Sequence, residues 1–218
     1  MRIDIWSDVV CPWCYIGKRR LERAIERRDD VEVVYHSFQL DPSSPKEATQ
    51  TVAEHLGEKY GGGRAAGQAM INRVEAVAAE EGLLFRLGEA KRGNTLDAHR
   101  LLHLALDQGG PALQGRLKEA LLAAYFLEAG NPADHHALLE VADEVGLDSA
   151  RSREVLAGDG FADAVEADLR QAVAYGATGV PFFVVDGRYG ISGAQPTDVF
   201  EQTLRQADAD LLNQGSRE

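Results

Sequence analysis

The alternation of apolar and polar residues at the start of the chain predicts a strand that leads directly into a helix. Residues 3–6 read Ile-Asp-Ile-Trp, which has the period of two of a half-buried strand. After residue 11 the period becomes helical, and one stripe holds Gly17, Leu21, Ala24, Ile25 and Arg28. Residues 31–38 are rich in β-branched and aromatic side chains, so they predict a second strand.

A long helical block follows the second predicted strand. From about residue 46 to residue 176 nearly every segment has helical period, with glycines and N-cap residues marking the ends. Asn94, with Asp97 three residues later, predicts one helix start. Gly110-Pro111 and Asn131-Pro132 predict two more, because proline suits the first turn of a helix.

Strand character returns only near the end of the chain. Phe182 to Val185 predicts a strand, and Asp186-Gly187 predicts a tight hairpin to residues 188–191. A final helix is expected from near Thr197 to Leu212. The order of elements indicates an α/β fold, in which a helical domain is inserted into a small mixed sheet, because neither end of the chain can bury a sheet alone.

Composition and charge exclude several classes of protein. The chain has 218 residues, 44% of them apolar and 27% charged, which is typical of a globular protein of one or two domains. Its net charge of −12 disfavours binding to nucleic acid or to an anionic membrane surface. No apolar run is long enough to span a bilayer, and the first residues lack the apolar stretch of a signal peptide. We therefore expect a cytoplasmic protein.

The two cysteines of the chain lie at the predicted junction of the first strand and helix. Cys11 is expected at the helix N-cap, Pro12 at the first helical position, and Cys14 one turn further in. Unpaired backbone N–H groups and the helix dipole favour a thiolate at an N-cap, so Cys11 is the expected nucleophile. Cys14 should be more buried and should resolve a mixed disulfide formed at Cys11. Trp13, also between the cysteines, should influence how well the thiolate is stabilised.

Other interpretations of these residues remain open but explain less. A structural zinc site needs four ligands, and one Cys-X-X-Cys supplies two. A static disulfide across so short a loop would add little stability. His99 and His103 lie four residues apart without the glutamate of a His-Glu-X-X-His motif, so packing is expected and no metal site is predicted. The basic residues Lys18, Arg19, Arg20 and Arg23 are expected to form a solvated face.

Three segments together resemble one known family. They are Ser7 to Gly17, with the sequence SDVVCPWCYIG; Asn94 to Arg100, with NTLDAHR; and Thr178 to Phe183, with TGVPFF. In order and spacing they are similar to the FrnE branch of the DsbA-like thioredoxin superfamily, and the resemblance covers essentially the whole chain. It implies a thioredoxin-like fold with a large all-helical domain inserted after the second strand. Residues 1–42 and 178–218 would form the thioredoxin-like domain, and residues 43–177 the insert.

The resemblance also implies an activity and a site. The chain is expected to be a thiol–disulfide oxidoreductase that exchanges its Cys11-Cys14 pair with protein or small-thiol substrates. Pro181 would be a cis-proline facing the dithiol, and Thr178, Gly179 and Val180 would contact substrate. No bound cofactor is implied, although glutathione or another thiol would be a co-substrate.

Two other functions compete with this hypothesis. The superfamily contains the 2-hydroxychromene-2-carboxylate isomerases and kappa-class glutathione transferases, which generally carry serine in place of the nucleophilic cysteine. Where those enzymes commonly have Ser-Asp near the final helix, this chain has Ser192-Gly193-Ala194-Gln195, a departure that speaks against tight glutathione binding. The third alternative is a noncatalytic module that binds a partner through its helical insert.

Overall fold

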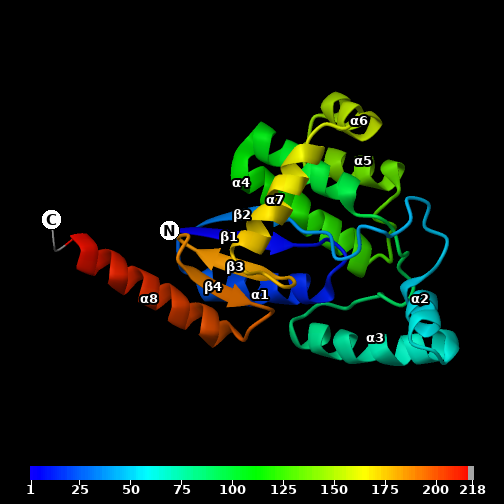
Figure 1. The fold of residues 1–218 in the computed structure, drawn as a ribbon, viewed down its shortest axis with the longest axis horizontal. Helices are drawn as coiled ribbons and strands as arrows, with labels where there is room; N and C mark the ends of the chain where they lie inside the picture. Colours follow the sequence, from blue (N-terminus) through cyan, green and yellow to red (C-terminus); the bar gives the residue numbers. More distant parts are fainter. Residues whose placement is uncertain (216–218) are drawn as a thin grey trace.

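A mixed four-stranded sheet forms the centre of the computed structural model, which describes residues 1–215 (Figure 1). The strands are β1 (Arg2–Ser7), β2 (Glu32–Ser37), β3 (Phe182–Val185) and β4 (Tyr189–Ser192), in the order β2-β1-β3-β4. β1 is parallel to β2 and antiparallel to β3, which pairs with β4 as a hairpin. Asp186 and Gly187 both have positive φ, as the predicted tight turn requires.

The alternation within β1 places side chains on both faces of this sheet. Ile3 and Ile5 pack on one face, against α1 (Pro12–Ile25) and α8 (Thr197–Gly215). Trp6 lies on the other face, against α7 (Ala162–Ala174), and its indole N–H donates to the Asp168 carbonyl at 2.9 Å. The sheet is therefore buried between helices, the fold class that the sequence predicts.

The inserted helices lie in the chain between β2 and β3. They are α2 (Val52–Lys59), α3 (Gly63–Glu80), α4 (Leu96–Phe126), α5 (His135–Glu144) and α6 (Ser149–Ala157), followed by α7. No helix among residues 1–215 has the length and apolar content to cross a membrane. The predicted domain limits of 1–42, 43–177 and 178–218 remain a proposal, and residues 216–218 lie outside the described part of the chain.

Helix starts in the insert differ from the sequence prediction in two places and agree with it in a third. α4 begins at Leu96, and Asn94 accepts the Leu96 N–H through its side chain, although Asn94 is not the N-cap. The start predicted at Gly110-Pro111 is confirmed, because Gly109 and Gly110 are not helical and divide α4 into two helical segments, the second of which begins at Pro111. α5 begins at His135 and not at the predicted Asn131-Pro132. Asp134 is its N-cap, because the Asp134 carboxylate accepts backbone N–H groups of the first turn.

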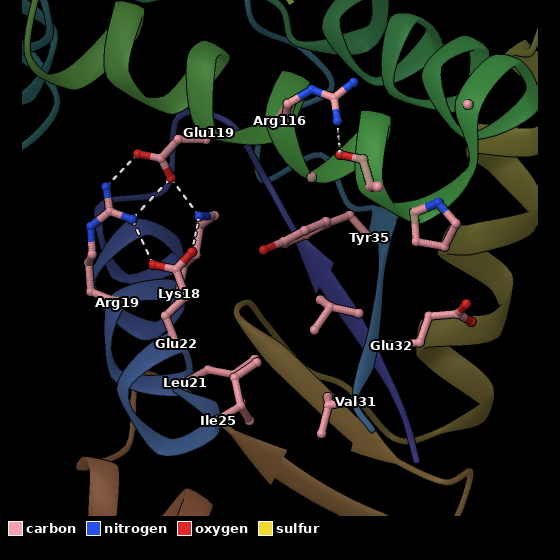
Figure 2. Close-up of a pocket in the computed structure, with 15 residues that line it drawn as sticks. Lys18, Arg19, Leu21, Glu22, Ile25, Val31, Glu32, Tyr35, Arg116 and Glu119 are labelled. Carbon is pink, nitrogen blue, oxygen red and sulfur yellow. Dashed lines mark hydrogen bonds and ion pairs between the residues drawn. The ribbon is translucent and has the colours of Figure 1, made fainter. Parts of the chain in front are cut away.

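The basic residues in the second half of α1 do not form a solvated face, contrary to the sequence prediction. Lys18 is buried and contacts Glu22 and Glu119, and Arg19 pairs with the same two carboxylates (Figure 2). Arg20 and Arg23 pair with Glu81. Every basic residue of the cluster thus has a carboxylate partner, and Glu119 and Glu81 join α1 to the inserted segment. A hollow of about 800 Å³ opens beside this network, between α1, β2 and α4, and neither cysteine lines it.

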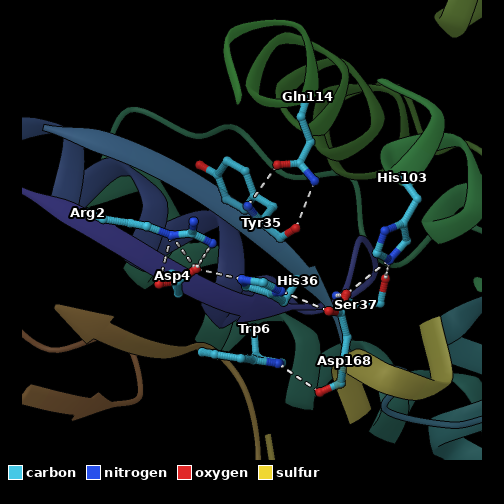
Figure 3. A network of polar contacts seen from close by, with 9 residues as sticks. All are labelled: Arg2, Asp4, Trp6, Tyr35, His36, Ser37, His103, Gln114 and Asp168. Atoms are coloured by element: carbon cyan, nitrogen blue, oxygen red, sulfur yellow. Dashed lines mark hydrogen bonds and ion pairs between the residues drawn. The ribbon is translucent and has the colours of Figure 1, made fainter. Parts of the chain in front are cut away.

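A second polar network attaches α7 and α4 to the sheet (Figure 3). The His36 ring on β2 bonds Asp168 at 2.8 Å and Asp4 at 2.7 Å, and it stacks on Trp6. His103 on α4 reaches the second Asp168 oxygen at 3.0 Å. His36 and His103 thus serve packing between the sheet and the insert. Within the described residues no group of His, Cys, Asp or Glu is arranged to hold a metal ion.

Candidate active site

The dithiol lies where the sheet meets the inserted helices. Val9, just before Cys11, packs into the core formed by α4, α5 and α6. Tyr15 and Ile16, just after Cys14, pack into the core of α2, α3 and α4. The turn between β1 and α1 is therefore held from both sides by the insert, which fixes the positions of the two sulfurs.

Cys11 is the N-cap of α1 and Pro12 is at the first helical position, as the sequence predicts. The Cys11 backbone is extended, with φ −89° and ψ 114°, and its side chain makes no capping hydrogen bond. Its sulfur lies at the helix end where backbone N–H groups lack intrahelical partners. The Cys11 Sγ contacts the Val180 carbonyl oxygen at 3.6 Å.

Cys14 lies one turn into α1, and its backbone N–H donates to the Cys11 carbonyl at 3.0 Å. Both cysteines are free, and each residue is 3% exposed. The expectation that Cys14 is more buried than Cys11 is therefore wrong when the exposed fractions of the two residues are compared. Burial raises the pKa of the Cys14 thiol well above its usual value, and the neighbouring Cys11 raises it further. Cys14 is therefore protonated at neutral pH.

The loop before β3 lies against the start of α1. The Val180–Pro181 peptide bond is cis, as the resemblance implies. Gly17 makes this close approach possible, since a Cβ there would lie 3.2 Å from both the Pro181 ring and the Phe183 ring. Pro181 is buried and Val180 half-buried, whereas Thr178, earlier in the loop, is exposed. Of these loop residues, Val180 makes the contact with the dithiol through its carbonyl.

A buried lysine lies close enough to both thiols to interact with them electrostatically. Lys118 of α4 is 1% exposed; its Nζ makes a long contact of 3.5 Å with the Ser7 carbonyl and lies 5.8 Å from the centre of the Tyr35 ring. Burial lowers the pKa of Lys118 to about 8, although its interactions with Cys14, Asp8 and Cys11 work in the opposite direction. A positive charge thus lies within electrostatic range of both thiols.

Asp8 and His99 form a buried pair next to this lysine. The Asp8 carboxylate accepts from His99 Nε2 at 3.2 Å and from the Leu40 N–H at 2.8 Å. Burial works to raise the pKa of Asp8, but the His99 bond and the other donors hold it below its usual value. Burial lowers the pKa of His99, so a neutral imidazole donates to an ionised carboxylate. Its Nδ1 has no hydrogen-bond partner among the described residues.

Sequence reasoning missed Asp8 and Lys118 as members of the site. Asp8 lies within the SDVVCPWC motif, but no local pattern assigns it a role. Lys118 carried a usable signal, because it lies on the same stripe of α4 as Leu121, Leu122 and Tyr125, which are all buried. A lysine on an apolar stripe is rare unless its charge has a function or a partner.

The two thiols should differ in reactivity. Cys14→Ser retains only Cys11, and Cys11→Ser retains only Cys14. Alkylation by iodoacetamide at about pH 7 is expected to be at least about tenfold faster in Cys14→Ser, because the raised pKa of Cys14 leaves little thiolate in the other variant. Mass spectrometry of samples taken over time measures both rates. Equal rates in the two variants would contradict the assignment of Cys11 as the nucleophile.

Lys118 should influence the redox balance of the dithiol. Because its charge stabilises a thiolate in the reduced form, Lys118→Met is expected to lower the reduction potential by about 30 mV, a tenfold change in the equilibrium with glutathione. The shift should shrink above about pH 8, where Lys118 loses its proton. Arg116→Met is the matched control, since Arg116 is exposed on the same helix. The same shift in both variants would exclude a specific effect of Lys118.

Comparison with known proteins agrees with this geometry. The DSBA-like thioredoxin domain matches residues 2–205. The crystal structure of a probable DsbA oxidoreductase from Streptomyces coelicolor is 45% identical in sequence, with a TM-score of 0.86 over 96% of this chain and 90% of that one.

Two more distant structures share the fold. The cytosolic disulfide reductase DsbM from Pseudomonas aeruginosa, solved with GSH, is 19% identical, with a TM-score of 0.62 over 95% of this chain and 98% of that one. A 2-hydroxychromene-2-carboxylate isomerase is 16% identical, with a TM-score of 0.67 over 100% of this chain and 98% of that one. At such identities the likeness concerns the fold alone.

Proposed function

This chain belongs to the DSBA-like thioredoxin domain family, and on that premise we propose that it is a thiol–disulfide oxidoreductase whose redox centre is the Cys11-Cys14 pair. The observation that carries the proposal is the arrangement of the two sulfurs. Cys11 lies at the start of α1 beside the Val180 carbonyl, and Cys14 follows one turn later with a raised pKa. Such a pair can hold one thiol for attack and keep the other protonated until it is needed.

In the reducing direction, the Cys11 thiolate attacks one sulfur of a substrate disulfide. The substrate S–S bond breaks, one sulfur leaves as a thiolate that takes a proton, and the other remains bound to Cys11 as a mixed disulfide. Cys14 then loses its proton and attacks the Cys11 sulfur, which releases the second substrate thiol. The chain ends as an internal disulfide, and the substrate has gained two electrons. Oxidation of a dithiol substrate is the same sequence in reverse.

The loop before β3 is the proposed contact with substrate. Thr178, Gly179 and Val180 lead into Pro181, and the Val180 carbonyl already lies beside the Cys11 sulfur. Backbone groups in such a segment can pair with an extended peptide of many sequences. Pro12, Trp13 and Pro181 would complete the site around the sulfurs.

Several finer assignments belong to the same proposal. The quoted motifs support placing the chain in the FrnE branch of the family. Its substrates would be proteins or small disulfides, with glutathione or another thiol as the electron donor that restores the dithiol. We place the protein in the cytoplasm, because in that reducing compartment a chain with two cysteines uses them for catalysis more often than for a structural disulfide.

A disulfide reduction assay separates this proposal from its two alternatives. Purified wild type, Cys11→Ser and Cys14→Ser are compared for reduction of a protein disulfide, with dithiothreitol or glutathione as the donor. Turnover that needs both cysteines and accepts either donor supports the oxidoreductase. Turnover that needs glutathione and tolerates Cys14→Ser would indicate the isomerase or transferase class, and no turnover by the wild type would favour a noncatalytic binding module.

A further inference from the structure

The hollow of about 800 Å³ beside the network of Lys18, Arg19, Glu22 and Glu119 has room for a small molecule (Figure 2). Small-molecule sites in proteins are typically hollows of about 300–1,000 Å³. This one opens at the edge of the sheet, because β2 is an outer strand. Neither cysteine lines it, so its occupant does not depend on the proposed function.

Small residues of α4 keep this space open. At Tyr35 the Gln114 side chain covers the outer edge of β2, because it donates to the Tyr35 carbonyl at 2.8 Å and accepts the Tyr35 N–H at 2.9 Å. Around Gln114, the residues of α4 that line the hollow include Gly109, Ala112 and Gly115. A Cβ at Gly115 would enter open space, since nothing packs within 4 Å of it. Larger side chains at these positions would fill the hollow.

Tyr35 carries a buried hydroxyl group that has no partner in the described part of the chain. The residue is 8% exposed, and Figure 2 shows its ring reaching from β2 toward α1, into the hollow. The backbone of Tyr35 bonds Gln114, but its hydroxyl makes no hydrogen bond with any described residue. Burial raises the pKa of Tyr35, and Glu22 and Glu119 raise it further, so the hydroxyl keeps its proton. Because a buried donor normally has an acceptor, this hydroxyl indicates a ligand atom that accepts from it.

The rest of the lining limits the charge of the ligand. An apolar wall comes from α1 and β2 and consists of Leu21, Ile25, Val31 and Val33. In the adjoining network two cations are each paired with the same two carboxylates, so no cation there lacks a partner. Glu32 and Arg116 also line the hollow, but both are exposed and their charges are opposite. A charged ligand group placed against the buried part of the lining would have no counter-ion, which is unfavourable.

We propose that this hollow is a second binding site, which takes a small uncharged molecule with an apolar body and a carbonyl oxygen at one end. The carbonyl oxygen accepts from the Tyr35 hydroxyl, and the apolar body packs against Leu21 and Val33. Burial of the apolar body supplies most of the affinity, and the hydrogen bond supplies the selectivity.

Three matched probes test the ligand class. Prodan is an uncharged naphthalene that carries a dimethylamino group and a propionyl group. In one analogue a methylene group replaces the carbonyl of prodan, and in the other a carboxylate replaces the propionyl group. Equilibrium dialysis against the purified wild type gives the Kd of each probe. Prodan is expected to bind about fivefold more tightly than the methylene analogue, the effect of one neutral hydrogen bond, and at least about tenfold more tightly than the carboxylate.

Two variants test whether the hollow is the site. Tyr35→Phe removes the hydroxyl and keeps the ring, so it should weaken prodan about fivefold and leave the methylene analogue unchanged. Gly115→Leu fills the hollow and should weaken prodan at least about tenfold. Leucine favours a helix more than glycine does, so this replacement is compatible with the fold, which circular dichroism checks. Ala167→Leu is the matched control, because Ala167 is exposed on α7 outside the hollow.

Each contrary outcome overturns a defined part of the proposal. No binding of prodan to the wild type, or undiminished binding to Gly115→Leu, would overturn the assignment of the hollow. Equal losses for prodan and the methylene analogue in Tyr35→Phe, or tighter binding of the carboxylate, would overturn the ligand class. A wild-type dimer that Gly115→Leu dissociates, seen by analytical ultracentrifugation, would identify a second copy as the occupant instead. None of these measurements involves turnover of the dithiol, so their failure leaves the proposed function intact.

Discussion

Cys11→Ser is expected to reduce the rate of disulfide reduction by at least about a thousandfold, because a serine hydroxyl is not a nucleophile at neutral pH. The Cys11 sulfur lies at the start of α1 next to Val180, where an incoming disulfide can be attacked. Steady-state reduction of a protein disulfide with dithiothreitol as donor measures the loss. Circular dichroism should show an unchanged fold, because a hydroxyl fits where the thiol was.

The loss should depend on the position of the serine in the dithiol. Cys14→Ser also stops multiple turnover but should still react once with substrate, since the first attack needs only Cys11. A Cys11→Ser protein that retained more than about a tenth of the wild-type rate would show that another group performs the attack.

Asp168→Asn is expected to lower the free energy of unfolding by about 3 kcal/mol, which is typical of a buried ion pair that loses one partner. Asp168 accepts from His36, His103 and the Ser37 backbone N–H, and it joins α7 to the sheet (Figure 3). Glu166→Gln on the same helix is the control, since its ion pair with Arg170 is exposed and should contribute less than about 1 kcal/mol.

The destabilisation should depend on pH in a defined direction. Burial favours the neutral ring, but the hydrogen bonds to Asp168 and Asp4 raise the pKa of His36 to about 9 from 6.5. A raised pKa contributes stability that is complete below about pH 6.5 and is lost as the pH rises through about 9. The difference between wild type and Asp168→Asn should therefore be larger at about pH 6 than at about pH 10.

Acid should also weaken this network, by protonating Asp168. Burial works to raise the pKa of Asp168, but the bonds from His103, His36 and Ser37 hold it far below 3.8. A lowered pKa contributes stability that is present above about pH 4 and is lost as the pH falls further. Urea unfolding of both proteins across this range measures the whole profile, and a difference independent of pH would show that the ion pair contributes nothing specific.

Features set by neighbouring residues could be predicted from the sequence. Cys11 at the N-cap and Pro12 in the first turn follow from local helix chemistry, and the hairpin follows from Asp186-Gly187. The cis bond before Pro181 came from the family resemblance, because only about 5–6% of X-Pro bonds in folded proteins are cis. The fold class followed from the order of strands and helices.

Features set by long-range contacts could not be predicted in this way. Lys18 was expected in solvent, yet it pairs with Glu119 of α4. The two residues are 101 positions apart, so no local sequence pattern predicts this pairing. His99 was expected to serve packing, and the structure adds its buried partner Asp8, which is 91 residues away. Lys118 lies within electrostatic range of the dithiol only because α4 packs against β2.

The central claim is that Cys11 attacks substrate and Cys14 resolves the mixed disulfide. The most direct measurement mixes reduced Cys14→Ser and reduced Cys11→Ser separately with a protein disulfide, quenches with acid, and maps the adducts by mass spectrometry. We predict a stable mixed disulfide on Cys11 in Cys14→Ser, little adduct on Cys14 in Cys11→Ser, and none accumulating in wild type. Equal adducts on the two cysteines, or no adduct on Cys11, would contradict the account.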